Sequence, residues 1–354
     1  MNRLFHSGVL ITVALGLLAP VTSAFADPAQ PPIPIAALDP SQPVTFGIRP
    51  ATAKGPDDRP RLSYTAAPGS VIKDFVAVTN ISDIPLTLRV YAADAFNTSN
   101  GGYDLLAFGH PSIDVGAWAA TAMNSVSVAA RATAIVPFTL SVPDKASPGD
   151  HSAGIVASLT SEQVDAKGDR ILVDKRVGTR IYLRVPGDLR PALKIEGLDS
   201  TFHQTLNPVG HGRTTVTYTV HNIGNLRLQG SQRLQVRTPW GSTAEGPRLP
   251  DIPQLLPGSS VSVTSDVDGV LPAFWDTAAV RVDPIPPPGD QDPVLPVAAA
   301  SDTFAAVPWA LLTLLVALGL AVLVWRTLRR RRDGRPGQGP EGPVNPEVPH
   351  APLQ

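Results

Sequence analysis

The phrase VTNISDIPL at residues 78–86 returns as VHNIGNLRL at residues 220–228. In both copies an apolar run reaches an Asn, passes a short polar stretch and continues with apolar residues at every second position. This pattern is typical of two strands joined by a tight turn. Because the side chains of a strand alternate between two faces, one face of each copy must pack against a core. The repeat therefore predicts two copies of one β-structure in a single chain.

A second shared element supports the repeat. Residues 126–143 and residues 255–272 both contain a turn, an alternating strand and then Pro. The 354 residues include 38 Pro and 29 Gly, and turn signals recur at intervals of about 8–12 residues, as in β-sandwiches. We therefore predict an all-β fold of two tandem Ig-like β-sandwich domains, followed by a single C-terminal transmembrane helix.

The two ends of the chain predict its location. Residues 1–26 have one Arg, an apolar run and a small-residue site before Asp27, which indicates a secretory signal peptide, with an uncleaved anchor as the alternative. Residues 304–325 are uncharged and would span about 33 Å as a helix, enough to cross a bilayer. The arginines that follow are typical of the cytoplasmic side. We expect a single-pass protein of the cell membrane with an extracellular ectodomain and a cytoplasmic C-terminus.

These signals divide the chain into consecutive segments. The predicted segments are a signal peptide (1–26), a Pro-rich spacer (27–42), a first β-sandwich domain (43–188), a second, Ig-like β-sandwich domain (189–283), a Pro-rich stalk (284–303), the transmembrane helix (304–325) and a basic, disordered cytoplasmic tail (326–354).

Charge and cysteine content exclude several functions. Residues 27–303 hold 22 basic and 27 acidic residues, a net charge of about −5, which argues against nucleic acid as a partner. The chain has no cysteine, so it can form neither a disulfide nor a thiolate metal site. We expect no cofactor.

The sequence shows no catalytic motif. GxSxG, HExxH and GxxxxGK[ST] are all absent, and the seven histidines have no metal-ligand spacing. Asp150, His151 and Ser152 are adjacent, but neighbours on a strand point to alternate faces and cannot form a relay. We therefore predict no catalytic residues, no metal site and no enzyme activity.

One candidate binding surface lies on the strand predicted at residues 175–185. Arg176, Arg180, Tyr182 and Arg184 share one face, and successive arginines are about 13 Å apart at roughly 3.3 Å per residue. Their forked donors suit spaced carboxylates or phosphates. The alternative is a solvated face, or ion pairs with an adjacent strand or with the second domain.

A second candidate is the segment 95–118, which is rich in Gly, Asn and aromatic residues. An aromatic ring and amides on a loop commonly stack on and hydrogen-bond a sugar ring, and Asn97, Asn100, Tyr103 and Trp118 could act in this way. A structural turn with its aromatic side chains in the core is the alternative interpretation.

Several phrases of the first domain also carry a family resemblance. In order they are TAAPGS (65–70), VTNIS (78–82), AADAFNTSNGGYDLL (92–106), GAW (116–118), VPFTLSVPDKASPGDHSAGIVASL (136–159) and RVGTRIYLRVPG (176–187). This succession resembles the N-terminal domain of actinobacterial members of the WxL-interacting protein family. The resemblance implies a peptidoglycan-binding N-terminal domain, a second Ig-like domain that binds a host or partner protein, and a C-terminal membrane helix with a basic tail.

Together these features predict a non-enzymatic, membrane-anchored protein of the bacterial cell envelope. It would act as a surface scaffold that binds cell-wall polymer, a secreted partner protein, or both. The alternative is a chaperone-like assembly factor for secreted surface subunits, which would offer a strand edge to its client.

Overall fold

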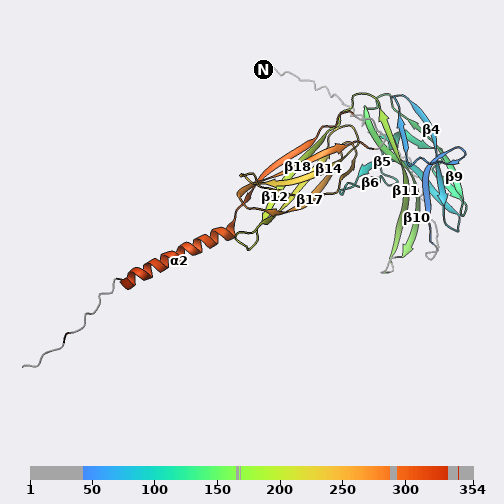
Figure 1. The fold of residues 1–354 in the computed structure, drawn as a ribbon. Helices are drawn as coiled ribbons and strands as arrows, with labels where there is room; N and C mark the ends of the chain where they lie inside the picture. Colours follow the sequence, from blue (N-terminus) through green and yellow to red (C-terminus); the bar gives the residue numbers. More distant parts are fainter. Residues whose placement is uncertain (1–42, 165–166, 168, 288–292, 334–341, 343–354) are drawn as a thin grey trace, which may run out of the picture.

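The structure is a computed structural model that describes residues 43–164, 167, 169–287, 293–333 and 342. The predicted signal peptide and Pro-rich spacer lie outside these residues. Two β-sandwiches follow one another along the chain, and one long helix leaves the far end of the second (Figure 1). The predicted fold class, two tandem Ig-like sandwiches and a C-terminal helix, is confirmed.

The first sandwich consists of two facing sheets. One has the strand order β2-β1-β4-β9-β7, and the other has the order β3-β11-β10-β5-β6 with β8 paired to β5. The elements are β1 (Phe46–Thr52), β2 (Gly55–Pro56), β3 (Leu62–Thr65), β4 (Val71–Asn80), β5 (Leu86–Asn97), β6 (Tyr103–Leu105), α1 (Val115–Trp118), β7 (Ala119–Thr121), β8 (Ser125–Val128), β9 (Thr133–Ser141), β10 (Gly149–Val164) and β11 (Arg170–Val185).

The second sandwich is smaller. A three-stranded sheet of order β12-β13-β17 faces a sheet of order β15-β14-β18-β19, in which β16 also pairs with β14. The elements are β12 (Leu193–His203), β13 (Gly212–Asn222), β14 (Leu228–Arg237), β15 (Thr243–Glu245), β16 (Ile252–Leu255), β17 (Ser260–Val270), β18 (Phe274–Ile285), β19 (Ala298–Ala306) and the helix α2 (Trp309–Asp333).

Each sandwich has its own apolar core, as the two-fold repeat requires. Leu88, Phe138 and Ile155 are fully buried or nearly so in the first core, and Tyr218 and Leu228 are fully buried in the second. Alternating burial along β13 follows the alternating sequence, since every second side chain from Gly212 to Asn222 is buried.

The predicted stalk is wrong over most of the described part of residues 284–303. β18 continues to Ile285, and residues 298–306 form β19, which pairs with β18 from Phe274↔Ala306 to Val282↔Ala298. The Pro-rich composition suggested an extended spacer, but buried Ala298 and Phe304 alternate with exposed residues and close the core of the second sandwich.

The boundaries of the C-terminal helix also differ from those predicted. Phe304 belongs to β19, and α2 begins only at Trp309. The helix then continues through the arginine cluster to Asp333, so the first residues of the predicted disordered tail are helical. Within the described residues one stretch, Trp309–Arg331, is long and apolar enough to cross a membrane, and an 18-residue window of it has a mean hydropathy of 2.2.

Candidate functional site

Part of the binding face predicted on β11 lies against the second domain. Tyr182 is only 3% exposed, and its hydroxyl donates a hydrogen bond to Oε1 of Gln254 at 2.9 Å. The Arg184 guanidinium donates to both carboxylate oxygens of Asp150, at 2.7 and 2.9 Å. This end of the strand therefore takes part in the interdomain contact. Here the alternative prediction holds, that the polar face of the strand pairs with an adjacent strand and with the second domain.

Asp150 is the charged centre of the interdomain contact. Its side chain is fully buried, and Oδ2 accepts the backbone N–H of Arg227 at 2.9 Å and lies 3.3 Å from Nε of the same residue. The Arg227 guanidinium also covers the Tyr182 ring, 3.9 Å from its centroid. Burial alone would raise the pKa of Asp150, but the hydrogen bond from Arg184 and the charge of Arg227 outweigh burial and lower this pKa. A charged Asp150 thus joins the two domains.

The loop after β5 makes the other half of this contact. The Asn97 side-chain amide donates to the Gln254 carbonyl at 2.9 Å, and its Oδ1 accepts the Leu256 N–H at 2.8 Å. Gly101 has a φ of +80°, and a Cβ there would lie 2.4 Å from the Pro253 side chain. Only glycine allows this approach without strain. Asn97 therefore binds the second domain rather than projecting freely into solvent.

Tyr103, Arg180 and Arg176 surround the edge of the interdomain contact. The Tyr103 hydroxyl donates to the Ala153 carbonyl at 2.7 Å, and the Arg180 guanidinium stacks 4.4 Å from the centroid of the Tyr103 ring. The Arg176 Nη1 donates to the Leu105 carbonyl at 3.1 Å. Burial raises the pKa of Tyr103 far above its usual range, so this phenol stays neutral.

Trp118 and Asn100 lie apart from the arginine face. Trp118 ends the short helix α1, packs against the first core and has its ring centroid 5.0 Å from that of His151. Asn100 is exposed at a loop tip, where its Oδ1 accepts a hydrogen bond from the Thr98 hydroxyl. The eight predicted residues therefore form no single pocket, and only some of them face solvent.

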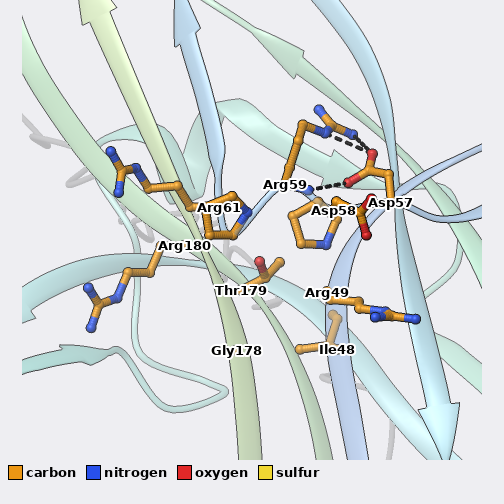
Figure 2. Close-up of a pocket in the computed structure, with 11 residues that line it drawn as sticks. Ile48, Arg49, Asp57, Asp58, Arg59, Arg61, Gly178, Thr179 and Arg180 are labelled. Carbon is orange, nitrogen blue, oxygen red and sulfur yellow. Dashed lines mark hydrogen bonds and ion pairs between the residues drawn. The ribbon is translucent and has the colours of Figure 1, made fainter. Parts of the chain in front are cut away.

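A cleft in the first domain gathers charged residues, most of which were not among the residues predicted from the sequence. It has a volume of about 590 Å³ and lies between β1, the segment joining β2 to β3, and β11 (Figure 2). Its lining residues are Ile48, Arg49, Pro50, Asp57, Asp58, Arg59, Pro60, Arg61, Gly178, Thr179 and Arg180. Four arginines against two aspartates make the cleft positive.

Arg59 anchors the wall of this cleft. Its guanidinium lies 2.7 Å from Asp57 and 2.6 Å from Asp74, and the Tyr64 hydroxyl also donates to Asp74 at 2.6 Å. Burial acts to raise the pKa of Asp74, but the hydrogen bonds from Arg59 and Tyr64 keep this pKa below its ordinary value. Asp74 interrupts the apolar alternation of β4. Its carboxylate binds Arg59 and Tyr64 and so fixes the wall of the cleft.

The other cleft arginines differ in their contacts, since Arg180 and Arg61 lie against tyrosine rings and the Arg180 guanidinium also donates to the Tyr182 hydroxyl at 3.4 Å. Arg49 on β1 and Arg180 on β11 are both exposed and lie on either side of the cleft in Figure 2. Arg61 approaches the Tyr182 ring at 5.6 Å. Arg180 is thus the one residue that belongs both to the predicted arginine face and to the observed cleft.

Two open strand edges flank the cleft. β11 pairs with β10 along its whole length, but it pairs with β3 only from Ile181 to Arg184. β1 pairs with β4, and its pairing with β2 involves only Ala51 and Thr52. Within the described residues, therefore, no strand pairs with the outer edge of β11 over residues 170–180. Such an edge presents backbone donors and acceptors to an incoming extended chain.

Sequence reasoning missed Arg49, Arg59 and Arg61 because they carry no motif. The signal available was the basic segment around residues 49–61, which holds four cationic side chains near Pro and Gly. Without the sandwich topology, nothing in the sequence shows that β1 and β11 lie on two sides of one cleft.

Neither a catalytic relay nor a metal cluster occurs in the described part of the chain. His151 Nδ1 lies 2.7 Å from Asp114 and its Nε2 lies 2.8 Å from the Ser147 carbonyl, while neighbouring Asp150 faces the interdomain contact. Burial would lower the pKa of His151, but the hydrogen bond to Asp114 raises it. Among the described residues, no group of three or more His, Cys, Asp or Glu side chains could hold a metal ion.

No family model matches this chain, and no curated protein matches it. Among solved structures, a chaperone–tip adhesin complex of CFA/I fimbriae biogenesis is 11% identical, with a TM-score of 0.35 over 75% of this chain and 99% of that chain. The class 5 fimbriae chaperone CfaA is also 11% identical, with a TM-score of 0.34 over 75% of this chain and 100% of that chain.

The CupB2 chaperone of Pseudomonas aeruginosa is a third solved structure with this likeness. It is 11% identical, with a TM-score of 0.27 over 71% of this chain and 99% of that chain. The fold class of this chain rests on the strand pairing described above.

Proposed function

We propose that this chain is a non-enzymatic, membrane-anchored binding protein of the cell envelope. Its proposed ligand is an extended, acidic segment of a secreted partner protein. The observation that carries the proposal is the open edge of β11 beside the arginine cleft. An extended segment can add to an open edge through its backbone, and its side chains then reach the neighbouring cleft at every second position.

The charge of the cleft selects an acidic ligand. Arg49 and Arg180 are exposed on opposite sides of the cleft, and each guanidinium can bind a carboxylate through two parallel hydrogen bonds. The remainder of the ectodomain is net acidic, so the cleft is a local positive site on a negative protein. Attraction of this kind weakens as salt concentration rises.

The proposed anchor is the helix Trp309–Arg331. Its length and apolar composition suit one membrane crossing, and Arg326, Arg329, Arg330 and Arg331 near its end favour a cytoplasmic C-terminus. Both sandwiches would then lie outside the membrane. Protease added to intact cells should digest the ectodomain and leave a small membrane-held fragment.

The resemblance to WxL-interacting proteins supports a second ligand class, a cell-wall polymer of the peptidoglycan type. The open edge also supports the alternative role of a chaperone-like assembly factor, which would pair with a secreted subunit through a strand. The three hypotheses differ in the ligand that the cleft binds. This ligand would be an acidic protein segment, the cell wall, or a subunit that is later released into a surface assembly.

The decisive experiment uses the full chain in detergent micelles or nanodiscs. Retention of secreted proteins and of isolated cell walls is measured for the wild type, for Arg49→Ser combined with Arg180→Ser, and for Arg237→Ser, an exposed arginine on β14. We expect the double variant to lose retention of a secreted protein by about tenfold or more, because two charge-assisted contacts are lost. Arg237→Ser should bind normally.

The other possible results of the retention experiment would change the proposal. Loss of wall retention alone would replace the protein ligand by a wall polymer. Unchanged retention of both by a folded double variant would remove the cleft as the binding site. Arg49 is exposed, and Arg180 contributes only its stacking on Tyr103 and a 3.4 Å hydrogen bond to the Tyr182 hydroxyl, so the double variant should lose no more than about 1 kcal/mol of stability.

A further inference from the structure

Exposed apolar side chains gather at the end of the second domain from which α2 leaves. We call this set the tip; it comprises Leu206, Val209, Leu271, Phe274 and Trp275. Leu206 is 99% exposed and Val209 is 74% exposed. Strand register places them together, since Gly212 lies opposite Val270 and Phe274 lies opposite Ala306. Single exposed apolar residues are ordinary, but a cluster at one end of a domain marks an interaction surface.

The loop between β12 and β13 is held against the start of α2. The backbone N–H of Trp309 donates to the side-chain oxygen of Gln204 at 3.0 Å. Beside this bond lies a hollow of about 710 Å³ whose lining is mainly apolar. The loop contributes Leu206 and Pro208 to its wall, and the helix contributes residues as far along as Ala317. Leu206 of the tip therefore lies alongside the first two turns of α2.

The length of α2 sets the depth of those two turns in a bilayer. From Trp309 to Arg326 the helix rises about 26 Å at 1.5 Å per residue, and a hydrocarbon core is about 30 Å thick. The apolar part of the helix is therefore no longer than the hydrocarbon core is thick, so none of its turns can lie outside the bilayer. Ala317, about 12 Å along the helix from Trp309, must then lie inside the hydrocarbon region. A loop that shares a hollow with Ala317 lies at the level of the lipid headgroups or below them.

The aromatic residues of the tip suit this position. Phe274 and Trp275 begin β18, opposite the last two residues of β19 and just before the helix, and Phe274 has an unusual positive φ of 70°. Their side chains are 44% and 60% exposed. Trp concentrates at the membrane–water interface, where its ring is covered and its indole N–H stays hydrated, and Phe adds apolar surface on the membrane side of interfacial segments.

We propose that the tip of the second domain rests in the outer interface of the bilayer, with phospholipid as its partner. Leu206 and Val209 contact acyl chains, and the aromatic pair lies at headgroup level. This inference rests on the proposed membrane anchor and adds to it. The ectodomain stands directly on the membrane surface, held by the helix and by the tip, instead of being raised above the membrane by a Pro-rich stalk.

The absence of cysteine from the chain makes a direct test simple. Single variants Leu206→Cys, Ile113→Cys and Leu318→Cys of the full chain are labelled with an environment-sensitive fluorophore and placed in phospholipid vesicles. Lipids that carry a nitroxide quencher near the headgroup or on the acyl chain then report contact. Ile113 is 88% exposed in the first domain and serves as the water control, and Leu318 lies on α2 and serves as the membrane control.

We expect quenching at Leu206 to approach that at Leu318 and to exceed that at Ile113 by about threefold or more. Val209→Asp in the Leu206→Cys background should reduce it, because a charge resists burial in lipid. Val209 is exposed in the ectodomain, so this change leaves the sandwich folded. Quenching at Leu206 equal to that at Ile113, with Leu318 quenched, overturns the tip proposal alone. Absence of quenching at Leu318 overturns the membrane anchor and the tip together.

Discussion

The two copies of the repeated turn make the same hydrogen bonds. Asn80 and Asn222 are both buried, and each side-chain amide donates to the carbonyl four residues ahead, Ile84 at 2.8 Å and Leu226 at 2.7 Å. Each amide also donates to the last carbonyl of a strand in the facing sheet, Val128 of β8 at 3.1 Å and Leu255 of β16 at 3.0 Å. Each Asn Oδ1 accepts a backbone N–H two residues ahead. The repeat is therefore one structural device used twice.

The two turns differ in what they present outward. In the first copy Asp83 pairs with Arg131, and both side chains are largely exposed. In the second copy the Asn225 carbonyl accepts the N–H of Asp150 at 2.8 Å, and Arg227 approaches the same carboxylate. The buried Asn fixes the turn, so the outward residues are free to serve another purpose. In the second domain that purpose is to hold the first domain.

The largest expected effect comes from removing the charge that the second turn binds. Asp150→Ala should destabilise the protein by about 3–5 kcal/mol, because it leaves the buried cations of Arg184 and Arg227 without their carboxylate. Asp83→Ala is the matched change in the first turn and should cost less than about 1 kcal/mol, since the pair is exposed. Denaturant unfolding of the full chain measures both. Similar small losses for both variants would show that the interdomain ion pair is not a stabilising contact.

Asp276, a buried carboxylate of the second domain, differs from Asp150 in having no charged partner in the part of the chain that the structure describes. Neither oxygen of Asp276 has a hydrogen-bond partner among the described residues, and burial raises its pKa to about 6 from 3.8. The folded state therefore binds this proton more tightly than the unfolded state. The resulting stability is fully present below pH 3.8 and is lost as pH rises through about 6.

Asp276→Asn should remove this pH dependence. About two pKa units correspond to roughly 3 kcal/mol, so the variant should be more stable than the wild type at pH 7 and should lose its slope between pH 4 and 6. Asp150 acts in the opposite direction, because its lowered pKa contributes stability that is lost as pH falls through that pKa. Thermal unfolding across pH 3–8 measures both. A wild-type slope that survives in Asp276→Asn would contradict the assignment.

The buried asparagines of the two turns should contribute equally to the free energy of unfolding of the two domains. Asn80→Ala and Asn222→Ala each leave buried carbonyls without a donor, which costs about 2 kcal/mol per site. Ser replacements at the same positions keep one donor and should cost less. If only one Asn proved important, the two turns would be alike in sequence and geometry but not in energy.

Local patterns in the sequence predicted the strands and the turns well, because alternation and turn residues act within a few positions. Long-range partners were not predictable in this way. Arg184 was placed correctly on the polar face of its strand, but its carboxylate lies 34 residues away and Arg227 lies in the other domain. Tyr182 was expected at the surface and is buried because the second domain covers it. The charged contact between the two sandwiches therefore predicts that they unfold together.

Predictions from composition were wrong where packing between distant segments determines the structure. Proline around residues 284–296 favoured a stalk, yet the small alternating residues of β19 complete the sheet that begins with β14. The arginine cleft was missed for the converse reason, since Arg49 and Arg180 are 131 positions apart and only the sandwich brings them together.

The smallest expected effect concerns the left-handed residue that each turn packs against. Arg131 has a φ of 56°, and the corresponding residue of the second copy is Gly258, with a φ of 75°. No atom lies within 4 Å of a Cβ built on Gly258, so Gly258→Ala tests backbone strain alone and should cost about 1 kcal/mol. Arg131→Gly should be neutral or stabilising by up to about 1 kcal/mol, because relief of strain exceeds the loss of an exposed ion pair. Chemical denaturation of the two variants gives both values. A destabilised Arg131→Gly together with a neutral Gly258→Ala would mean that the two turns share a hydrogen-bond pattern but not a backbone constraint.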